Sequence, residues 1–168
     1  ISRQLIDKYC IRFNENFFGG EGFSFSIDCF CHAKKVVVGH QKLYCYRVDN
    51  SESGTTKFNL HLMKSNIEAQ KYIKNNLVQS NSVLLQACKY ANWHTYCDNL
   101  NTIVGCKVIK QYKEFYNDIK KVCKKDALYA LRAPISKKDK YKRILYSTNP
   151  YLAAKIINHF GMKKFTAK

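Results

Sequence analysis

An alternation of apolar and polar side chains over residues 23–32, interrupted at Phe30, constrains the fold of this chain more than any other feature. Apolar side chains occupy every odd position from 23 to 31, and polar ones occur at Ser24, Ser26, Asp28 and His32. Because side chains two residues apart lie on the same face of a β-strand, this pattern predicts a strand with one buried face.

Two further strands are expected directly after this one. The first covers residues 36–48, where Gly39 marks a bulge, and the polar run at 49–54 turns the chain back. The second covers residues 57–63. Three neighbouring strands with short connections predict an antiparallel meander, to which the short apolar segments 103–106 and 143–146 are expected to add one or two strands.

Apolar residues spaced three or four apart predict helices elsewhere in the chain. In the first 20 residues, this spacing predicts a short helix that ends at Gly19 and Gly20. Ser65 and Glu68 have the spacing of a capping box, which predicts a helix from 65 to about 77.

Three more helices are expected over residues 82–97, 110–131 and 149–161. Asn149 and Pro150 are suited to the N-cap and first position of the last one. The predicted fold class is therefore α+β. An antiparallel sheet, mainly from the N-terminal half, is packed by helices mainly from the C-terminal half, and residues 1–168 form one compact domain.

The chain is strongly basic, with 29 Lys and Arg against 12 Asp and Glu in 168 residues, a net charge of +17. Over half of this charge lies in residues 107–143, where thirteen Lys and Arg face four acids. Such a concentration predicts one electropositive surface that binds a polyanion. The alternative is an ordinary solvated helix face, and part of the lysine excess fits a gene built from AT-rich codons.

The predicted polyanion-binding surface combines lysines with an exposed aromatic ring. Its residues are Lys107, Lys110, Lys113, Lys120, Lys121, Lys124, Lys125, Lys137, Lys138, Lys140, Tyr141, Lys142 and Arg143. Tyr112 and Tyr116 are interleaved with these lysines, and exposed tyrosines could stack on bases or sugars. Because lysine dominates, contacts to phosphate or sulfate are expected rather than the bidentate reading of bases that arginine favours.

Eight cysteines, an even number, predict disulfides in an oxidising compartment, with buried thiols as the alternative. Cys88 and Cys97 would lie about 13 Å apart along one unbroken helix, so they are not expected to pair with each other. No C-x-x-C pair occurs in the sequence, and a metal site is not expected.

The glycine-rich turn at residues 17–22, followed by 23–27, resembles the acidic end of the LAGLIDADG homing-endonuclease motif, in which a helix ends in an acid and a strand follows. The resemblance implies that Glu21 binds a divalent cation that activates water. The sequence departs from the motif at Gly19, which replaces the usual acid, and at 14–16, where Asn-Glu-Asn replaces small residues. In the alternative reading, the glycines end a helix and Glu21 is solvated.

These features favour a non-catalytic protein that binds DNA, RNA or a heparin-like glycan, with no cofactor and no catalytic residue. The alternative is a small metal-dependent nuclease that holds its substrate on the same basic surface. No apolar run approaches the roughly 18 residues of a membrane span. The first residue is Ile1, so we expect that a segment was removed. A secreted location is expected, with an intracellular or nuclear one as the alternative.

Overall fold

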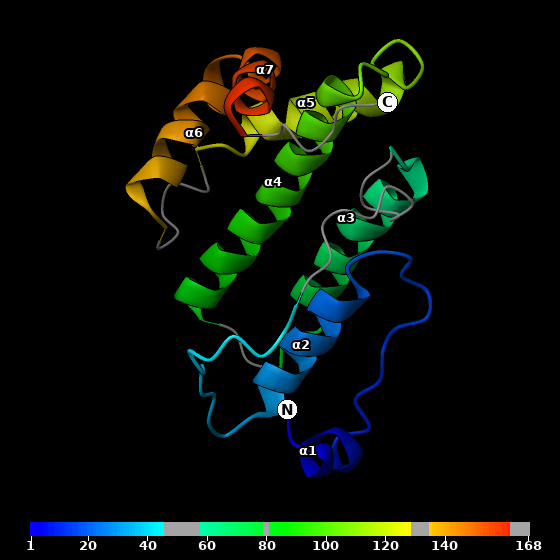
Figure 1. Ribbon diagram of the computed structural model, residues 1–168, viewed down its shortest axis with the longest axis vertical. Coiled ribbons are helices and arrows are strands. Elements are labelled where there is room, and N and C mark those ends of the chain that lie inside the picture. The colour runs from blue at the N-terminus through cyan, green and yellow to red at the C-terminus, as the bar shows by residue number, and fades with distance from the viewer. Residues whose placement is uncertain (46–57, 79–80, 129–134, 162–168) are drawn as a thin grey trace. The chain divides into compact units, whose positions relative to one another are not determined.

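The computed structural model describes residues 1–45, 58–78, 81–128 and 135–161 (Figure 1). The chain divides into two compact units, Ile1–Gln79 and Ser80–Lys168. The first contains α1 (Arg3–Lys8), α2 (Glu21–His32) and α3 (Leu60–Asn75). The second contains α4 (Ser82–Gly105), α5 (Lys113–Lys125), α6 (Lys137–Thr148) and α7 (Pro150–Gly161). Whether the whole chain behaves as one domain stays a prediction.

The predicted α+β fold class is wrong, because all regular structure in the described ranges is helical and no strand occurs there. The alternating segment that was expected to be the first strand forms α2. Its serines satisfy their hydroxyls inside the helix: Ser24 donates to the carbonyl of Glu21 at 3.0 Å and Ser26 to that of Gly22 at 2.8 Å. A polar residue at every second position therefore does not oppose a helix here.

The other expected strands are also replaced. Residues 36–45 have no regular structure, and the remainder of that expected strand lies outside the described residues. From Leu60 onward, the third expected strand is part of α3, whose N-cap is Asn59: its side-chain oxygen accepts the N–H of Leu62 at 3.1 Å. The segments expected as later strands belong to the last turn of α4 and to the interior of α6.

Gly19 and Gly20 begin a helix instead of ending one. The expected N-terminal helix covers only Arg3–Lys8, and Gly20 is the N-cap of α2 with a φ of 84°. A Cβ atom at Gly20 would lie 2.6 Å from the Cβ of Ala69, so glycine allows α2 to approach α3 closely.

Ser65, predicted as a helix cap, is buried in the middle of α3. Its hydroxyl donates to the carbonyl of Gly19 and accepts the N–H of the same residue, both at 3.1 Å. This pair of hydrogen bonds holds the start of α2 against α3.

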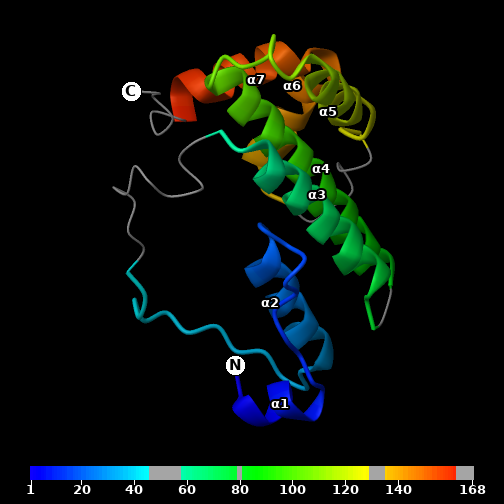
Figure 2. The same cartoon turned by 90° about the vertical axis from the view of Figure 1, so that its right-hand side faces the viewer.

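The second unit is built around α4, the longest described helix, with α5, α6 and α7 around its C-terminal half (Figure 2). Its core joins Trp93, Leu100 and Ile103 of α4 to Ile119 and Cys123 of α5, all of them buried. The indole N–H of Trp93 donates to the carbonyl of Cys123 at 2.9 Å, which fixes the ring at this interface.

The prediction for α7 is confirmed. The helix begins at Pro150 and ends at Gly161, and the side-chain oxygen of Asn149 accepts the N–H of Leu152 at 3.1 Å. The expected helices at 82–97 and 110–131 are confirmed as α4 and α5 with different bounds. None of the helices among the described residues combines the length and hydropathy needed to span a bilayer.

Candidate functional site

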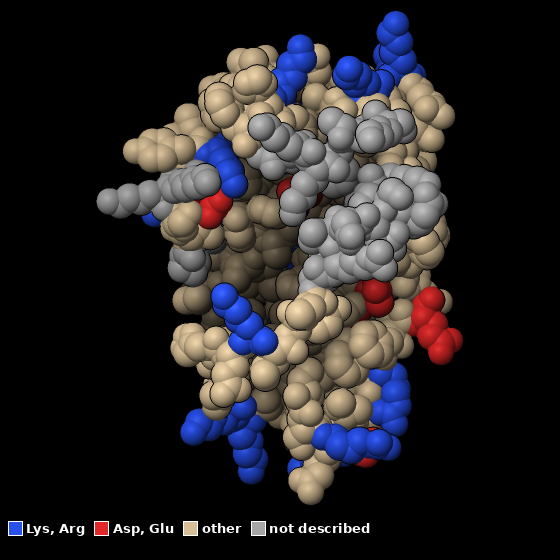
Figure 3. Space-filling view, in the orientation of Figure 1, with Lys and Arg blue, Asp and Glu red and all other residues tan. Residues whose placement is uncertain are grey.

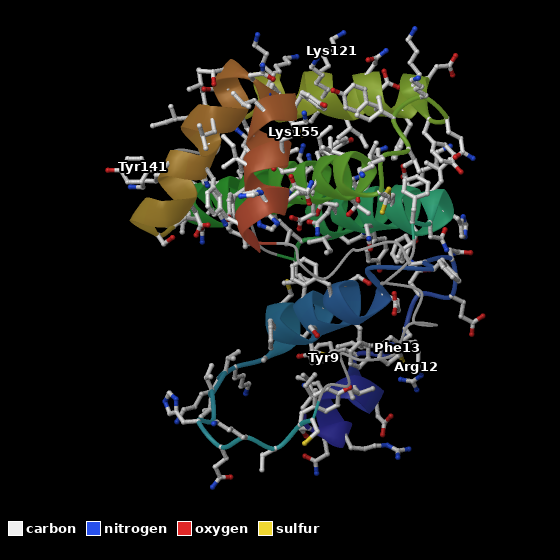
Figure 4. The ribbon with its side chains drawn as sticks, turned by 45° about the horizontal axis from the view of Figure 1, so that its top comes forward. Tyr9, Arg12, Phe13, Lys121, Tyr141 and Lys155 are labelled. Atoms are coloured by element: carbon white, nitrogen blue, oxygen red, sulfur yellow. The ribbon has the colours of Figure 1, made fainter. Side chains whose placement is uncertain are left out.

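The sequence of α5 separates an apolar flank from a basic one. Tyr116, Ile119 and Cys123, spaced three and four residues apart, are buried against the rest of the second unit. The remaining turns carry lysines, and Lys121 points outward from the helix (Figure 4). The helix therefore presents its charge to solvent because its apolar side chains are committed to the core.

Four of these lysines line a shared surface hollow of about 450 Å³ together with Asn117. We call Lys120, Lys121, Lys124 and Lys125 the lysine quartet. Lys120 is half-buried and the other three are exposed. The ion pairs that the structure places within the described ranges include none of these four side chains.

The quartet has an unfavourable arrangement for an isolated helix. Lysines three or four residues apart occur at 120–124, 121–124 and 121–125, and each such like-charge pair costs about 0.2–0.5 kcal/mol. Lys124 and Lys125 lie in the last turn, where the helix dipole favours positive charge. Helix stability thus accounts for Lys124 and Lys125 and gives no reason for the positive charges at Lys120 and Lys121.

Three predicted residues extend the basic surface toward the start of α5. Lys107, Lys110 and Lys113 are all exposed, and they lie in the connection from α4 and at the first position of α5. Lys107 adopts a positive φ of 59° in that connection. Figure 3 shows Lys and Arg side chains over the region where α5 lies, as well as elsewhere on the face in view.

The predicted residues on α6 do not all join this surface. Lys140 and Tyr141 are exposed, but Tyr141 points away from α6 in a different direction from Lys121 (Figure 4). Lys142 forms an ion pair with Asp139 at 3.4 Å, so its charge is already matched. The side chains of Lys137 and Lys138 lie outside the described part of the chain.

Arg143 was predicted on the binding surface, and the structure contradicts this because its side chain is 1% exposed. The guanidinium lies over the rings of Tyr90 and Trp93, with centroid distances of 4.6 and 5.4 Å. Burial lowers the pKa of Arg143, and the neighbouring Tyr90 partly opposes this effect. Arg143 therefore holds α6 against α4 and is not available to a polymer in solvent.

The tyrosines near the predicted surface also differ in their exposure to solvent. Tyr116 is 7% exposed, and burial raises its pKa, so it is a core residue rather than the stacking platform that was expected. Tyr112 is half-buried, whereas Tyr141 is 70% exposed and could still stack on a ligand.

One basic residue outside the predicted segment lies beside the α5 surface. Lys155 is exposed on the side of α7 near α5 (Figure 4), and its ammonium group lies 5.1 Å from the ring centroid of Tyr151. On α5, Lys120 lies over Tyr116 in a similar way at 5.7 Å. No local pattern in the sequence could place Lys155 here, because it depends on how α7 packs on α5.

Among the described residues, the acid and the cysteines singled out in the sequence form no metal site and no disulfide. Glu21 is exposed in the first turn of α2, so it opens a helix, whereas the resemblance to homing endonucleases requires an acid that ends one. Within the described ranges, no group of three or more His, Cys, Asp or Glu side chains could hold a metal ion. The eight cysteines all fall in these ranges, and no disulfide joins any two of them.

Comparison of the chain with protein-family models, with curated proteins and with solved structures gives no match.

Proposed function

We propose that this protein binds a polyanion through the lysine quartet of α5. The observation that carries the proposal is the placement of four lysines around one hollow, on a helix flank where the described residues supply no ion pair to them. A polymer of phosphate or sulfate groups would offset the like-charge repulsion within the quartet and release its own counterions to solvent.

The chemistry of the quartet favours a ligand that is recognised by charge. Ammonium groups act as point charges without the planar fork of arginine, and contacts of this kind to phosphate position a protein without reading base sequence. Lys155 and the exposed lysines that precede α5 would lengthen the contact along the polymer. We therefore expect similar affinity for DNA duplexes of different sequence and competition by heparin.

Charge reversal of the quartet tests the proposal. The variant carries Lys120→Glu, Lys121→Glu, Lys124→Glu and Lys125→Glu, and its affinity for a labelled DNA duplex is measured by fluorescence anisotropy at fixed salt. A matched variant carries the same change at Lys8, Lys34, Lys35 and Lys42, which are exposed in the first unit. Both variants lose the same net charge, so only the position of the charge differs.

The proposal requires that the quartet variant lose most of its affinity while the matched variant retains it. Equal losses in the two variants would mean that net charge alone drives binding, and no loss in the quartet variant would exclude α5 as the binding surface. No observation among the described residues supports the nuclease alternative, so it is not proposed.

A further inference from the structure

The first unit contains a larger cavity, of about 560 Å³, that the lysine quartet does not touch. It lies between α1, the C-terminal turns of α2 and residues 33–37, which follow α2 without regular structure. Its volume is within the range of about 300–1,000 Å³ that is typical of small-molecule sites.

The surface inside this cavity is mainly apolar. Leu5 of α1, Phe30 of α2 and Val36 contribute apolar side chains, and Cys29 is buried in α2 beside them. Phe30 is 50% exposed and Val36 is 53% exposed, so large apolar side chains remain in contact with solvent around the cavity. An apolar ligand would remove this surface from water, at a gain of about 25 cal/mol per Å² of apolar area.

The lysine side chains that line the cavity meet no acid among its described lining residues. Lys8, Lys34 and Lys35 all contribute to its lining and are exposed, and none of the described lining residues is Asp or Glu. The one acid on α1, Asp7, is paired with Arg3 at 3.1 Å and with Arg12 at 3.8 Å. The three lysines therefore have no carboxylate partner within the cavity.

His32 adds a polar group with a defined hydrogen bond. Its Nδ1 lies 2.8 Å from the carbonyl oxygen of Asp28, and because a carbonyl oxygen only accepts, Nδ1 carries the hydrogen. The ring of His32 packs against that of Tyr9 with centroids 4.4 Å apart. This contact joins α1 to the end of α2 and gives the cavity a fixed wall.

We propose that this cavity binds a single-chain anionic amphiphile, a long-chain carboxylate. The hydrocarbon chain lies against Leu5, Phe30 and Val36, and the carboxylate lies among Lys8, Lys34 and Lys35. Charge complementarity favours an anionic head group, because an uncharged one would leave three ammonium groups around it without a counter-charge. The site is independent of the polyanion surface on α5, which belongs to the second unit.

The experiment compares three probes by isothermal titration calorimetry: decanoate below its micellar concentration, 1-decanol and acetate. Decanoate should bind with a stoichiometry of one, 1-decanol should bind about tenfold more weakly or worse, and acetate should not bind measurably, because both the chain and the charge contribute. Absence of saturable decanoate binding, or equal affinity for 1-decanol, overturns the proposal.

Two variants locate the site, with retained helix content checked by circular dichroism. The triple variant Lys8→Gln, Lys34→Gln and Lys35→Gln should lose decanoate affinity and leave 1-decanol affinity unchanged, whereas Phe30→Gln should weaken both. Neutralising the lysine quartet on α5 removes more charge yet should leave decanoate binding intact. If the triple variant binds decanoate as tightly as the unaltered protein, the amphiphile lies elsewhere and the assignment fails.

Discussion

The salt dependence of polyanion binding gives the sharpest test of the lysine quartet. In the variant with Lys120→Gln, Lys121→Gln, Lys124→Gln and Lys125→Gln, up to four phosphate contacts are lost. Each contact contributes about 0.9 to the slope of log affinity against log salt for duplex DNA, so the slope should become shallower by up to about 3.6. Between 50 and 200 mM salt, that difference corresponds to a factor of about 150 in relative affinity.

The assay is fluorescence anisotropy with one labelled duplex at several KCl concentrations, for the unaltered protein and the variant. The slope is more informative than a single affinity because it counts neutralised phosphates and is insensitive to uncharged contacts. A matched variant with glutamine at Lys8, Lys34, Lys35 and Lys42 controls for net charge. A quartet slope within about 1 of the unaltered protein, or equal to that of the matched variant, would refute the reasoning.

The quartet variant is expected to fold, so a loss of binding can be interpreted. Three like-charge pairs, each costing about 0.2–0.5 kcal/mol, disappear from α5. Against this, Lys124 and Lys125 give up their interaction with the helix dipole, about 0.3–1 kcal/mol each. These terms nearly cancel, and all four side chains lie outside the core. Urea denaturation should therefore give a similar free energy of unfolding for both proteins.

Three further predictions concern stability. Gly20→Ala should lower the free energy of unfolding of the first unit by about 1–3 kcal/mol because of its positive φ and the clash with Ala69, whereas Gly22→Ala, which meets no neighbour, should raise it by about 0.5–1 kcal/mol. Urea denaturation of both variants checks this, and equal effects would contradict it. Arg143→Ala opens a cavity and should lower the free energy of unfolding by about 2–4 kcal/mol, whereas Arg143→Met should lower it by less. Arg143→Met should also leave the salt slope of DNA binding unchanged, and a shallower slope would place Arg143 on the binding surface. The hydrogen bond to Asp98 raises the pKa of His94, so the folded state binds that proton more tightly, and the free energy of unfolding should fall as pH rises from about 6.5 through the raised pKa. His94→Gln should reduce this slope in urea midpoints between pH 6 and 8, and an unchanged slope would assign the effect to another group.

Of the helices described in the second half, α4, α5 and α7 could be predicted because local signals and tertiary packing agree there, whereas α6 was not predicted. Asn149 and Pro150 specify the start of α7 through a side-chain hydrogen bond and a fixed φ, and both effects operate within a few residues. In the first half, the alternation over residues 23–31 gave the wrong period. The helix tolerates it because Ser24 and Ser26 bond to carbonyls of the preceding turn and because Cys29 packs as a small apolar residue.

The candidate surface could be predicted only in part. A count of charges along residues 107–143 selected a segment that includes α5, where the apolar residues leave a basic flank exposed. The count did not distinguish charged side chains that have a local acidic partner from those that have none. Lys142 has Asp139 three residues before it and pairs with it, whereas Lys120, Lys124 and Lys125 have no acid three or four residues away. Lys121 has Asp118 at the same spacing, but the described structure places no ion pair there.

The charge count placed Arg143 on the surface, and the strand expected over residues 143–146 was compatible with that position. In a strand over residues 143–146, Arg143 and Tyr146 would lie on opposite faces, so a buried Tyr146 would leave Arg143 in solvent. In a helix, residues three apart share a face, and Arg143 and Tyr146 of α6 are both buried. The phenol of Tyr146 donates to the side-chain oxygen of Asn101 at 2.6 Å, while Arg143 lies over Trp93 of the same helix. The charge count and the expected strand thus both left a buried cation on the surface, whereas the lysine quartet lies on a helix that the apolar spacing predicted.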